Sequence, residues 1–343
     1  MNKFDHKALK VVFLACLLAV VVIMLGAFTR LVDAGLGCPD WPGCYGQLTW
    51  PMTESEIITA NKAFPDAPVE TDKAWPEMVH RYFAGALGLL AIIIVSLVIR
   101  AKKHRPQAPL KHAIFLLAFV ILQGLFGMWT VTLKLWPQVV TAHLLGGFIT
   151  LTTLWLLFLR LRQRPWLALS MYVVQYRQLR FLALLGLVTV TLQIILGGWT
   201  TSNYAAVACP DLPTCQGQWL PETNFVTAFN FAQQVGPNYL GGALDNTARV
   251  TIHFMHRIGA IVTSIIVLMV IYRLFNIEHH QAKRFGYWIL TVLVAQILLG
   301  LSNIYFQFPV SVAVLHNIVG AILLVSMAGL CYHLHNVREG VSP

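Results

Sequence analysis

The amino-acid sequence predicts an all-α integral membrane protein with eight transmembrane helices, arranged as two pseudo-symmetric four-helix bundles. Three observations lead to this fold class. Long apolar runs alternate with polar segments along the whole chain. Only 11% of the residues are charged and the mean hydropathy is +0.67, whereas soluble domains carry about 25% charged residues. Several motifs also occur twice in the same order, which indicates a duplicated unit.

The apolar runs define the helices, because about 20 consecutive apolar residues are needed to cross a bilayer. The first run is too long for a signal peptide and no small-residue cleavage site follows it, so we expect it to remain as a helix. The eight predicted spans are Leu9–Leu31, Val79–Ile99, Ala113–Leu133, Val139–Leu159, Phe181–Thr201, Val250–Tyr272, Tyr287–Phe306 and Val310–Tyr332.

The formal net charge is +10, and the basic residues are distributed according to the predicted topology. Most of the 24 lysines and arginines lie before the first span, after the last, or in the connections that lie on the same side. The positive-inside rule makes that side cytoplasmic and places both termini there. The basic balance therefore indicates contact with anionic lipid and no nucleic-acid partner. Seven histidines share this edge, where we expect contact with solvent or lipid headgroups: His6, His104, His112, His279, His280, His333 and His335.

The two longest connections, 32–75 and 202–249, face outward and contain matching segments. Residues 38–47 read CPDWPGCYGQ and residues 209–218 read CPDLPTCQGQ, so seven of ten positions agree at an offset of 171. Four helices per half is an even number, so both halves share one orientation and form a parallel repeat. We expect an N-terminal half at 1–165 and a C-terminal half at 175–343. Other matching pairs are Gly26 and Gly197, His80 and His256, Gln123 and Gln296, Gly127 and Gly300, and His143 and His316.

Four of the six cysteines lie in these outward segments, as the pairs Cys38/Cys44 and Cys209/Cys215. In an oxidising compartment each pair can form a disulfide, and closing so short a loop contributes roughly 2 kcal/mol in the chain-entropy model. Structural disulfides, a redox relay and a thiolate site for copper or zinc all remain open. The metal site is the weakest of these, because each segment offers two thiolates and no nearby histidine.

Four histidines lie at one depth, roughly 5–10 Å below the outer boundary at about 1.5 Å per residue. They are His80, His143, His256 and His316, on the second and fourth helix of each half. Ionisable residues inside a bilayer are costly and usually functional, and imidazoles from two facing helices commonly hold a haem iron. We therefore expect one haem per half. Zinc is less favoured, because each half has two histidines and few candidates for a third ligand.

The halves differ at the position three residues before the first histidine of each pair, which is Glu77 in one half and His253 in the other. A carboxylate beside a haem can move protons, or it can complement the dipole at the helix N-terminus. His253 lies on the same helix face as His256 and is an alternative ligand. Arg81 and Arg257 follow the histidines, and we expect them to contact haem propionates or to extend to lipid headgroups.

Each of these motifs is short, but the set is specific. The motifs are Glu77-Met78-Val79-His80-Arg81, Thr141-Ala142-His143, His256-Arg257, Leu315-His316-Asn317, Cys38/Cys44 and Cys209/Cys215. Together they resemble the haem A synthase family over essentially the whole chain. The resemblance implies an oxidoreductase that converts haem O to haem A for terminal oxidases. The reaction oxidises one methyl group of the porphyrin through an alcohol to a formyl group.

The resemblance also implies roles for individual residues. His256 and His316 match the axial ligands of a haem b cofactor, whereas His80 and His143 match the site of the haem O substrate. Glu77 matches a glutamate with a proposed catalytic part. The first cysteine pair matches a disulfide with a proposed part in electron transfer or stability, and the second pair is one that some members lack.

The same resemblance implies a cell inner membrane location, with both termini cytoplasmic and the haem sites and cysteine segments on the periplasmic side. The expected partners are haem O and membrane lipid, with haem O synthase, an electron-transfer partner and a second copy of the chain as further candidates.

Three other functions are weighed against this one. A dihaem b-type cytochrome that only transfers electrons uses the same histidines, but it often places its haems on opposite sides of the membrane. A transporter requires charged residues near mid-membrane or broken helices, and the sequence shows little of either. A haem O synthase requires aspartate-rich motifs for Mg²⁺-diphosphate, and the sequence contains no aspartate cluster.

Overall fold

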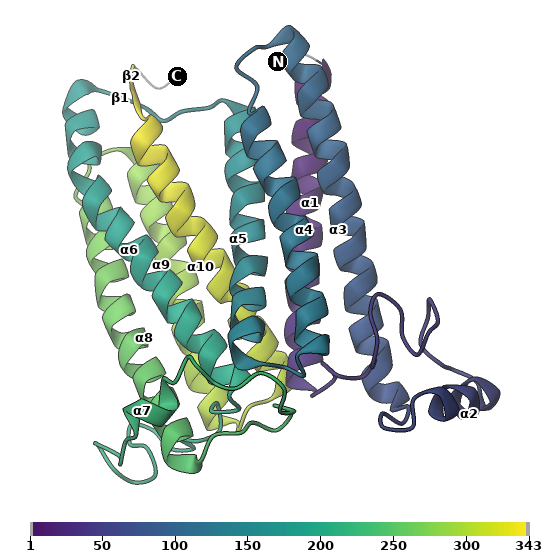
Figure 1. Ribbon diagram of the computed structural model, residues 1–343. Helices are drawn as coiled ribbons and strands as arrows, with labels where there is room; N and C mark the ends of the chain where they lie inside the picture. Colours follow the sequence, from purple (N-terminus) through teal and green to yellow (C-terminus); the bar gives the residue numbers. More distant parts are fainter. Residues whose placement is uncertain (1–2, 341–343) are drawn as a thin grey trace.

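The structure is a computed structural model that describes residues 3–340, and these residues form ten helices and two very short strands (Figure 1). Eight of the helices are long and apolar enough to cross a membrane, which confirms the predicted all-α membrane fold. The extreme ends of the predicted halves, 1–2 and 341–343, lie outside the described residues. The elements are α1 Lys3–Leu31, α2 Glu54–Ala63, α3 Thr71–His104, α4 Leu110–Thr132, α5 Pro137–Arg162, β1 Leu167–Ala168, α6 Ser170–Ser202, α7 Phe225–Ala228, α8 Asn246–Phe275, α9 His280–Tyr305, α10 Val310–Asn336 and β2 Arg338–Glu339.

Several membrane helices are longer than the apolar runs that predict them, because polar residues continue the helix beyond the apolar part. Helix α3 begins at Thr71, well before Val79, and so places Glu77 inside the helix. Prolines set other boundaries. Helix α5 has Pro137 at its first position, where the missing N–H has no helical partner to lose. Helix α3 ends at His104, because a residue that precedes proline disfavours helical dihedral angles.

Some short elements lie outside the predicted spans. Helix α2 starts with a capping box, in which the Thr53 side chain and the Glu56 side chain each accept the other residue's backbone N–H. The Thr-x-x-Glu spacing is a recognisable sequence signal for such a start. Helix α7 is a single turn in the second outer connection. Strands β1 and β2 pair in parallel and join the linker after α5 to the segment after α10.

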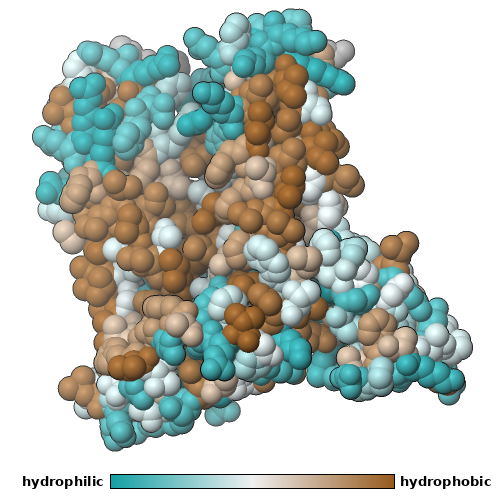
Figure 2. All heavy atoms as spheres, in the orientation of Figure 1, coloured by the Kyte–Doolittle hydropathy of each residue, from teal (hydrophilic) through white to brown (hydrophobic). Residues whose placement is uncertain are grey.

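The lateral surface of the molecule is apolar. Figure 2 shows a broad hydrophobic band between hydrophilic ends. Large apolar side chains on the membrane-spanning helices are exposed, including Phe181 at 77%, Leu89 at 64% and Leu298 at 58%. Soluble monomers rarely expose continuous apolar areas of this extent, so the band is the surface that meets lipid in a multi-pass membrane protein.

The packing of the first four spans is repeated by the last four. Helix α1 packs against α3 and α5, and in the same way α6 packs against α8 and α10. The two groups meet through α1 and α5 on one side and α6 and α10 on the other. Both described chain ends lie at one end of the bundle, and the loops that carry α2 and α7 lie at the opposite end (Figure 1).

The backbone repeats even where the residue types differ. Non-glycine residues with positive φ are uncommon, yet they recur at the repeat offset. Asp33 and Tyr204 both have φ 54°, and so do Tyr45 and Gln216. The duplicated unit therefore preserves turn geometry as well as motifs.

The two groups of helices also contact each other near the end of the bundle that carries α2 and α7. The Arg30 guanidinium donates to the Thr201 carbonyl oxygen (2.7 Å) and lies 4.1 Å from the ring centroid of Tyr204. The Tyr204 hydroxyl in turn donates to Asp33 Oδ1 (2.8 Å). Because these residues are related by the repeat offset, the contact lies where equivalent segments of the two groups face each other.

Candidate functional site

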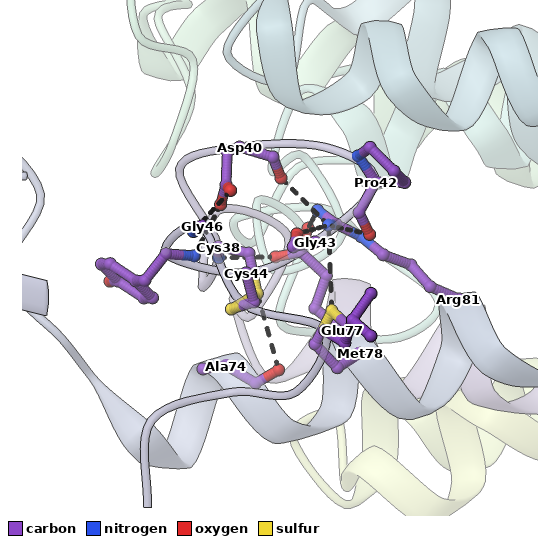
Figure 3. Close-up of a disulfide and its surroundings, with 12 residues drawn as sticks. Cys38, Asp40, Pro42, Gly43, Cys44, Gly46, Ala74, Glu77, Met78 and Arg81 are labelled. Atoms are coloured by element: carbon purple, nitrogen blue, oxygen red, sulfur yellow. Dashed lines mark hydrogen bonds and ion pairs between the residues drawn. A yellow bond between two sulfur atoms is a disulfide. The ribbon is translucent and has the colours of Figure 1, made fainter. Parts of the chain in front are cut away.

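Each cysteine pair forms a disulfide in a loop organised by an aspartate. Cys38 and Cys44 are bonded and fully buried. Figure 3 shows the Asp40 carboxylate pointing toward the turn that follows. It accepts the N–H groups of Tyr45 (2.6 Å) and Gly46 (2.8 Å). Gly46 has φ +74°, a conformation that glycine adopts without steric cost.

The second loop repeats this arrangement with Cys209 and Cys215 bonded. The Asp211 carboxylate accepts the N–H groups of Gln216 (2.6 Å) and Gly217 (3.0 Å), and also the Thr214 hydroxyl. These hydrogen bonds, that of the Thr214 hydroxyl above all and then that of the Gly217 N–H, favour the ionised carboxylate and lower the pKa of Asp211 to about 2. With the sulfur atoms bonded to each other, neither loop offers the thiolates that a copper or zinc site requires.

An arginine docks each loop on the helix that carries a histidine. Arg81 on α3 donates to the carbonyl oxygens of Asp40 (3.0 Å), Pro42 (3.3 Å) and Gly43, as Figure 3 shows. Arg257 on α8 repeats this with three carbonyl oxygens of the second loop, those of Cys209, Asp211 and Thr214. Both guanidinium groups are thus engaged by loop backbone, and the predicted haem propionate contacts stay a prediction.

Glu77 and His253 fill equivalent places between loop and helix, with different chemistry. Glu77 is 4% exposed, accepts the Cys38 N–H on Oε2 (3.1 Å) and forms an ion pair with Arg81 through Oε1. His253 is equally buried, and its Nδ1 accepts the Cys209 N–H (3.3 Å). A carboxylate therefore anchors the first loop and an imidazole the second. The spacing of Glu77 and Arg81, four residues apart, is the signal from which this ion pair was predictable.

The four predicted histidines lie on two pairs of facing helices. One pair is α3 with α5, and the other is α8 with α10. The ring centroids of His80 and His143 are 6.4 Å apart. An imidazole nitrogen binds a transition metal at about 2.0–2.1 Å and its ring centroid lies about 1.1 Å farther away, so two imidazoles on opposite sides of one iron have centroids roughly 6 Å apart. The separation of this pair matches that requirement.

Further observations fit a haem as the group that these histidines would hold. His80, His143 and His316 each keep a buried ring Nδ1 with no hydrogen-bond partner among the described residues. Within residues 3–340, no group of three or more His, Cys, Asp or Glu side chains is placed to hold a bare metal ion. A porphyrin supplies four nitrogens itself, so two histidines are sufficient for its iron.

Each of the four rings packs against a glycine of a neighbouring helix. The sequence alone does not indicate which glycine contacts which histidine. An added Cβ would lie 2.9 Å from His80 Cε1 at Gly26 and 3.1 Å from His256 Cε1 at Gly197. The equivalent distances are 3.4 Å for Gly127 with His143 and 3.2 Å for Gly300 with His316. The matching pairs Gly26/Gly197 and Gly127/Gly300 were visible in the repeat, but their contact with the histidines required the fold.

Glutamines contact the histidines of the C-terminal group. The Gln193 side-chain amide hydrogen bonds with His256 Nδ1 (3.0 Å) and donates to the His256 carbonyl oxygen (2.9 Å). The Gln296 amide lies 3.3 Å from His316 Nε2. At the repeat offset, Val22 takes the place of Gln193 in the N-terminal group. The two histidine pairs therefore differ in their polar neighbours as well as in the Glu77/His253 exchange.

Comparison with known proteins agrees with these features. The model of the COX15-CtaA family, described as cytochrome oxidase assembly protein, matches residues 10–328. The protein named Heme A synthase from Shewanella oneidensis is 45% identical over 322 residues, covering 94% of this chain and 95% of that protein. Proteins of the same name from Halalkalibacterium halodurans and Rickettsia prowazekii are 26% and 24% identical, with at least 94% of each chain covered. The chain belongs to the COX15-CtaA family.

Proposed function

We propose that this protein is a haem A synthase, an oxidoreductase that oxidises a methyl group of haem O through an alcohol to a formyl group. The observation that carries the proposal is the duplicated pair of facing histidines, set in a chain that is 45% identical to a Heme A synthase along nearly its whole length. The alternative, a dihaem cytochrome that only transfers electrons, would share the histidines, but the relatives favour the synthase.

The two groups of helices have different roles in this proposal. Haem O binds in the N-terminal half at His80 and His143, and haem b binds in the C-terminal half between His256 and His316. Haem b, when bound, supplies one-electron transfer. The assignment follows the family resemblance, and two polar neighbours support it. The buried carboxylate of Glu77 lies in the N-terminal half, and Gln193, whose place Val22 takes in the N-terminal half, contacts His256 in the C-terminal half.

Glu77 has two functions in the proposed reaction. Its carboxylate lies one helical turn before His80, where a base can accept a proton as the substrate methyl group is oxidised. It also accepts the Cys38 N–H and pairs with Arg81, so the same group fixes the disulfide loop against α3. A change in the charge of Glu77 therefore affects both proton transfer at the substrate and the contacts that hold the disulfide loop.

We place the protein in the cell inner membrane, with both termini cytoplasmic and the disulfide loops periplasmic. The basic residues at the end that holds the termini support this orientation, and disulfides persist in an oxidising compartment. Haem O synthase as the donor of substrate, an electron-transfer partner and self-association complete the proposal.

The direct test is haem analysis of protein purified from cells that also make haem O. We expect extracted haem A together with haem O or its hydroxylated intermediate, separated by chromatography with mass detection. Haem b alone, at two per protein, would instead identify an electron-transfer cytochrome.

The assignment of the halves is tested by four variants. His80→Ala and His143→Ala should abolish haem A formation and leave a haem b spectrum. His256→Ala and His316→Ala should remove the haem b spectrum. The opposite pattern would exchange the two roles.

The Glu77→Gln variant removes the base and the charge that pairs with Arg81, whereas glutamine still accepts the Cys38 N–H on its side-chain oxygen. We expect normal haem binding and turnover reduced by roughly 10²–10⁴-fold. Unchanged turnover would remove Glu77 from the chemistry. Glu77→Ala is the comparison, and it should also loosen the loop.

A further inference from the structure

A cavity of about 550 Å³ is lined by residues near the end of α5, in the linker after it, near the start of α9 and near the end of α10. Figure 1 shows these helix ends at the end of the bundle opposite the loops that carry α2 and α7. The cavity therefore lies where the N-terminal and C-terminal groups of helices are joined. Its volume falls within the range of about 300–1,000 Å³ that is typical of small-ligand sites.

The lining is strongly cationic. Arg162, Arg164 and Arg284 line the cavity, and its lining residues include no carboxylate. Among residues 3–340, none of these three arginines takes part in an ion pair. Helix α9 starts here at His280 without an acidic residue in its first turn, so the positive end of its dipole adds to the field. Like charges repel at close range, and an anion between them relieves this repulsion.

Aromatic rings form the rest of the site. The Trp166 ring is stacked on His333, with centroids 4.7 Å apart, and meets Phe285 edge-on at 5.6 Å. Trp155 and Trp288 also line the cavity, and Trp288 is half-exposed on the lateral surface. Tryptophan is enriched at membrane–water boundaries. His333 keeps a buried Nδ1 with no hydrogen-bond partner among the described residues.

We propose that this cavity binds the phosphate headgroup of an anionic phospholipid from the adjacent leaflet. Basic pockets between transmembrane helices on the cytoplasmic side bind such headgroups, and the tryptophans lie where the headgroup meets the acyl chains. A bound phosphate would bridge Arg162 on α5, Arg164 in the linker and Arg284 on α9. The lipid would thus hold together the two groups of helices. The inference is independent of the haem chemistry at the other end.

The test uses the full-length protein, purified in detergent and depleted of lipid. Dioleoyl phosphatidylglycerol, dioleoyl phosphatidylcholine and inorganic phosphate are titrated separately, and bound lipid is counted by native mass spectrometry. We expect the wild-type protein to bind phosphatidylglycerol in preference to phosphatidylcholine. Removing two guanidinium charges, in Arg162→Gln with Arg284→Gln, should weaken phosphatidylglycerol binding roughly 30-fold.

Two control variants make the test specific. Arg177→Gln with Arg273→Gln removes the same charge from exposed arginines at the same end that do not line the cavity, and should bind like wild type. Arg162→Lys with Arg284→Lys keeps the charge and should retain most binding. Haem content reports correct folding in every variant.

Equal binding of both lipids by the wild-type protein would overturn the proposal without any variant. Equal loss in the cavity and control pairs would overturn it as well. Displacement of phosphatidylglycerol by inorganic phosphate would assign the site to a free anion in place of a lipid.

Discussion

At the scale of single residues, the site depends on glycines that admit imidazole rings between helices. Gly26 and Gly197 occupy equivalent positions, and each leaves space for the Cε1 edge of one histidine. A side chain at either position would push the ring away from its partner on the facing helix. The orientation of an iron ligand is sensitive to such neighbours, whose loss typically costs 10–100-fold in metal affinity.

We therefore predict that Gly26→Ala and Gly197→Ala each weaken haem binding roughly tenfold, in the N-terminal and C-terminal half respectively. At Gly26, an added Cβ would lie closer to the histidine ring than real Cβ contacts allow. At Gly197, the added Cβ would make a contact tighter than most real ones. Haem content and the optical spectrum of the purified variants measure the effect. Gly85→Ala is the matched control, because nothing lies within 4 Å of that position. A comparable loss in the control would show that helix packing in general is responsible.

At the scale of elements, the two disulfide loops repeat one arrangement of hydrogen bonds. An aspartate carboxylate holds the turn amides and an arginine from the histidine helix holds the loop carbonyls. The copies differ in their buried anchor, which is Glu77 in the first and His253 in the second. A carboxylate can form an ion pair with the arginine, whereas a neutral imidazole cannot. Arg257 therefore donates to the Cys209 carbonyl oxygen instead.

The low pKa of Asp211 makes the second loop sensitive to acid. Because the pKa in the folded loop is about 2, below its ordinary value of 3.8, the carboxylate stabilises the loop fully above pH 3.8. That stabilisation is lost as the pH falls toward 2. We predict that a phosphine reductant attacks the Cys209–Cys215 disulfide faster across this range, relative to a small reference disulfide.

The Asp211→Asn variant should show fast reduction already at neutral pH, with little further change on acidification. The rate is followed by labelling the released thiols and measuring mass. If the wild-type rate, normalised to the reference, is constant between pH 4 and 2, the carboxylate does not control access to this disulfide.

At the scale of the whole molecule, the parallel repeat puts both histidine pairs near the same end of the bundle and joins the halves across α1, α5, α6 and α10. At the end that carries the disulfide loops, the joint includes Arg30, which is 13% exposed, with Thr201 and Tyr204. Near the other end it includes the linker, its strand pair with the C-terminal segment, and the cationic cavity. The two halves therefore contact each other at both ends of the bundle.

We predict that Arg30→Ala lowers the free energy of unfolding by roughly 2–4 kcal/mol, since it removes a charged hydrogen bond and a cation–π contact. Unfolding in mixed micelles measures the change. Arg177→Ala, an exposed arginine on α6, should stay within about 0.5 kcal/mol of wild type. Equal stability of Arg30→Ala and the control would mean that helix packing alone joins the halves.

The amino-acid sequence was enough to predict the eight spans and the repeat, and it supplied the candidate site residues, because apolar length, composition and motif order are local or simply countable properties. It did not determine the lengths of α3 and α6, since polar residues can extend a helix without leaving an apolar signal. It also gave no sign that Arg81 and Arg257 donate to loop carbonyl oxygens, because those contacts join segments about 40 residues apart.

Which groups meet followed from the packing of the folded chain: each histidine with its glycine, Glu77 with the Cys38 amide, and three arginines around one cavity. The physical reason is the same in each case. The rotation of a helix about its axis and the placement of a loop against it are set by packing between segments far apart in the chain, and no local pattern records that packing.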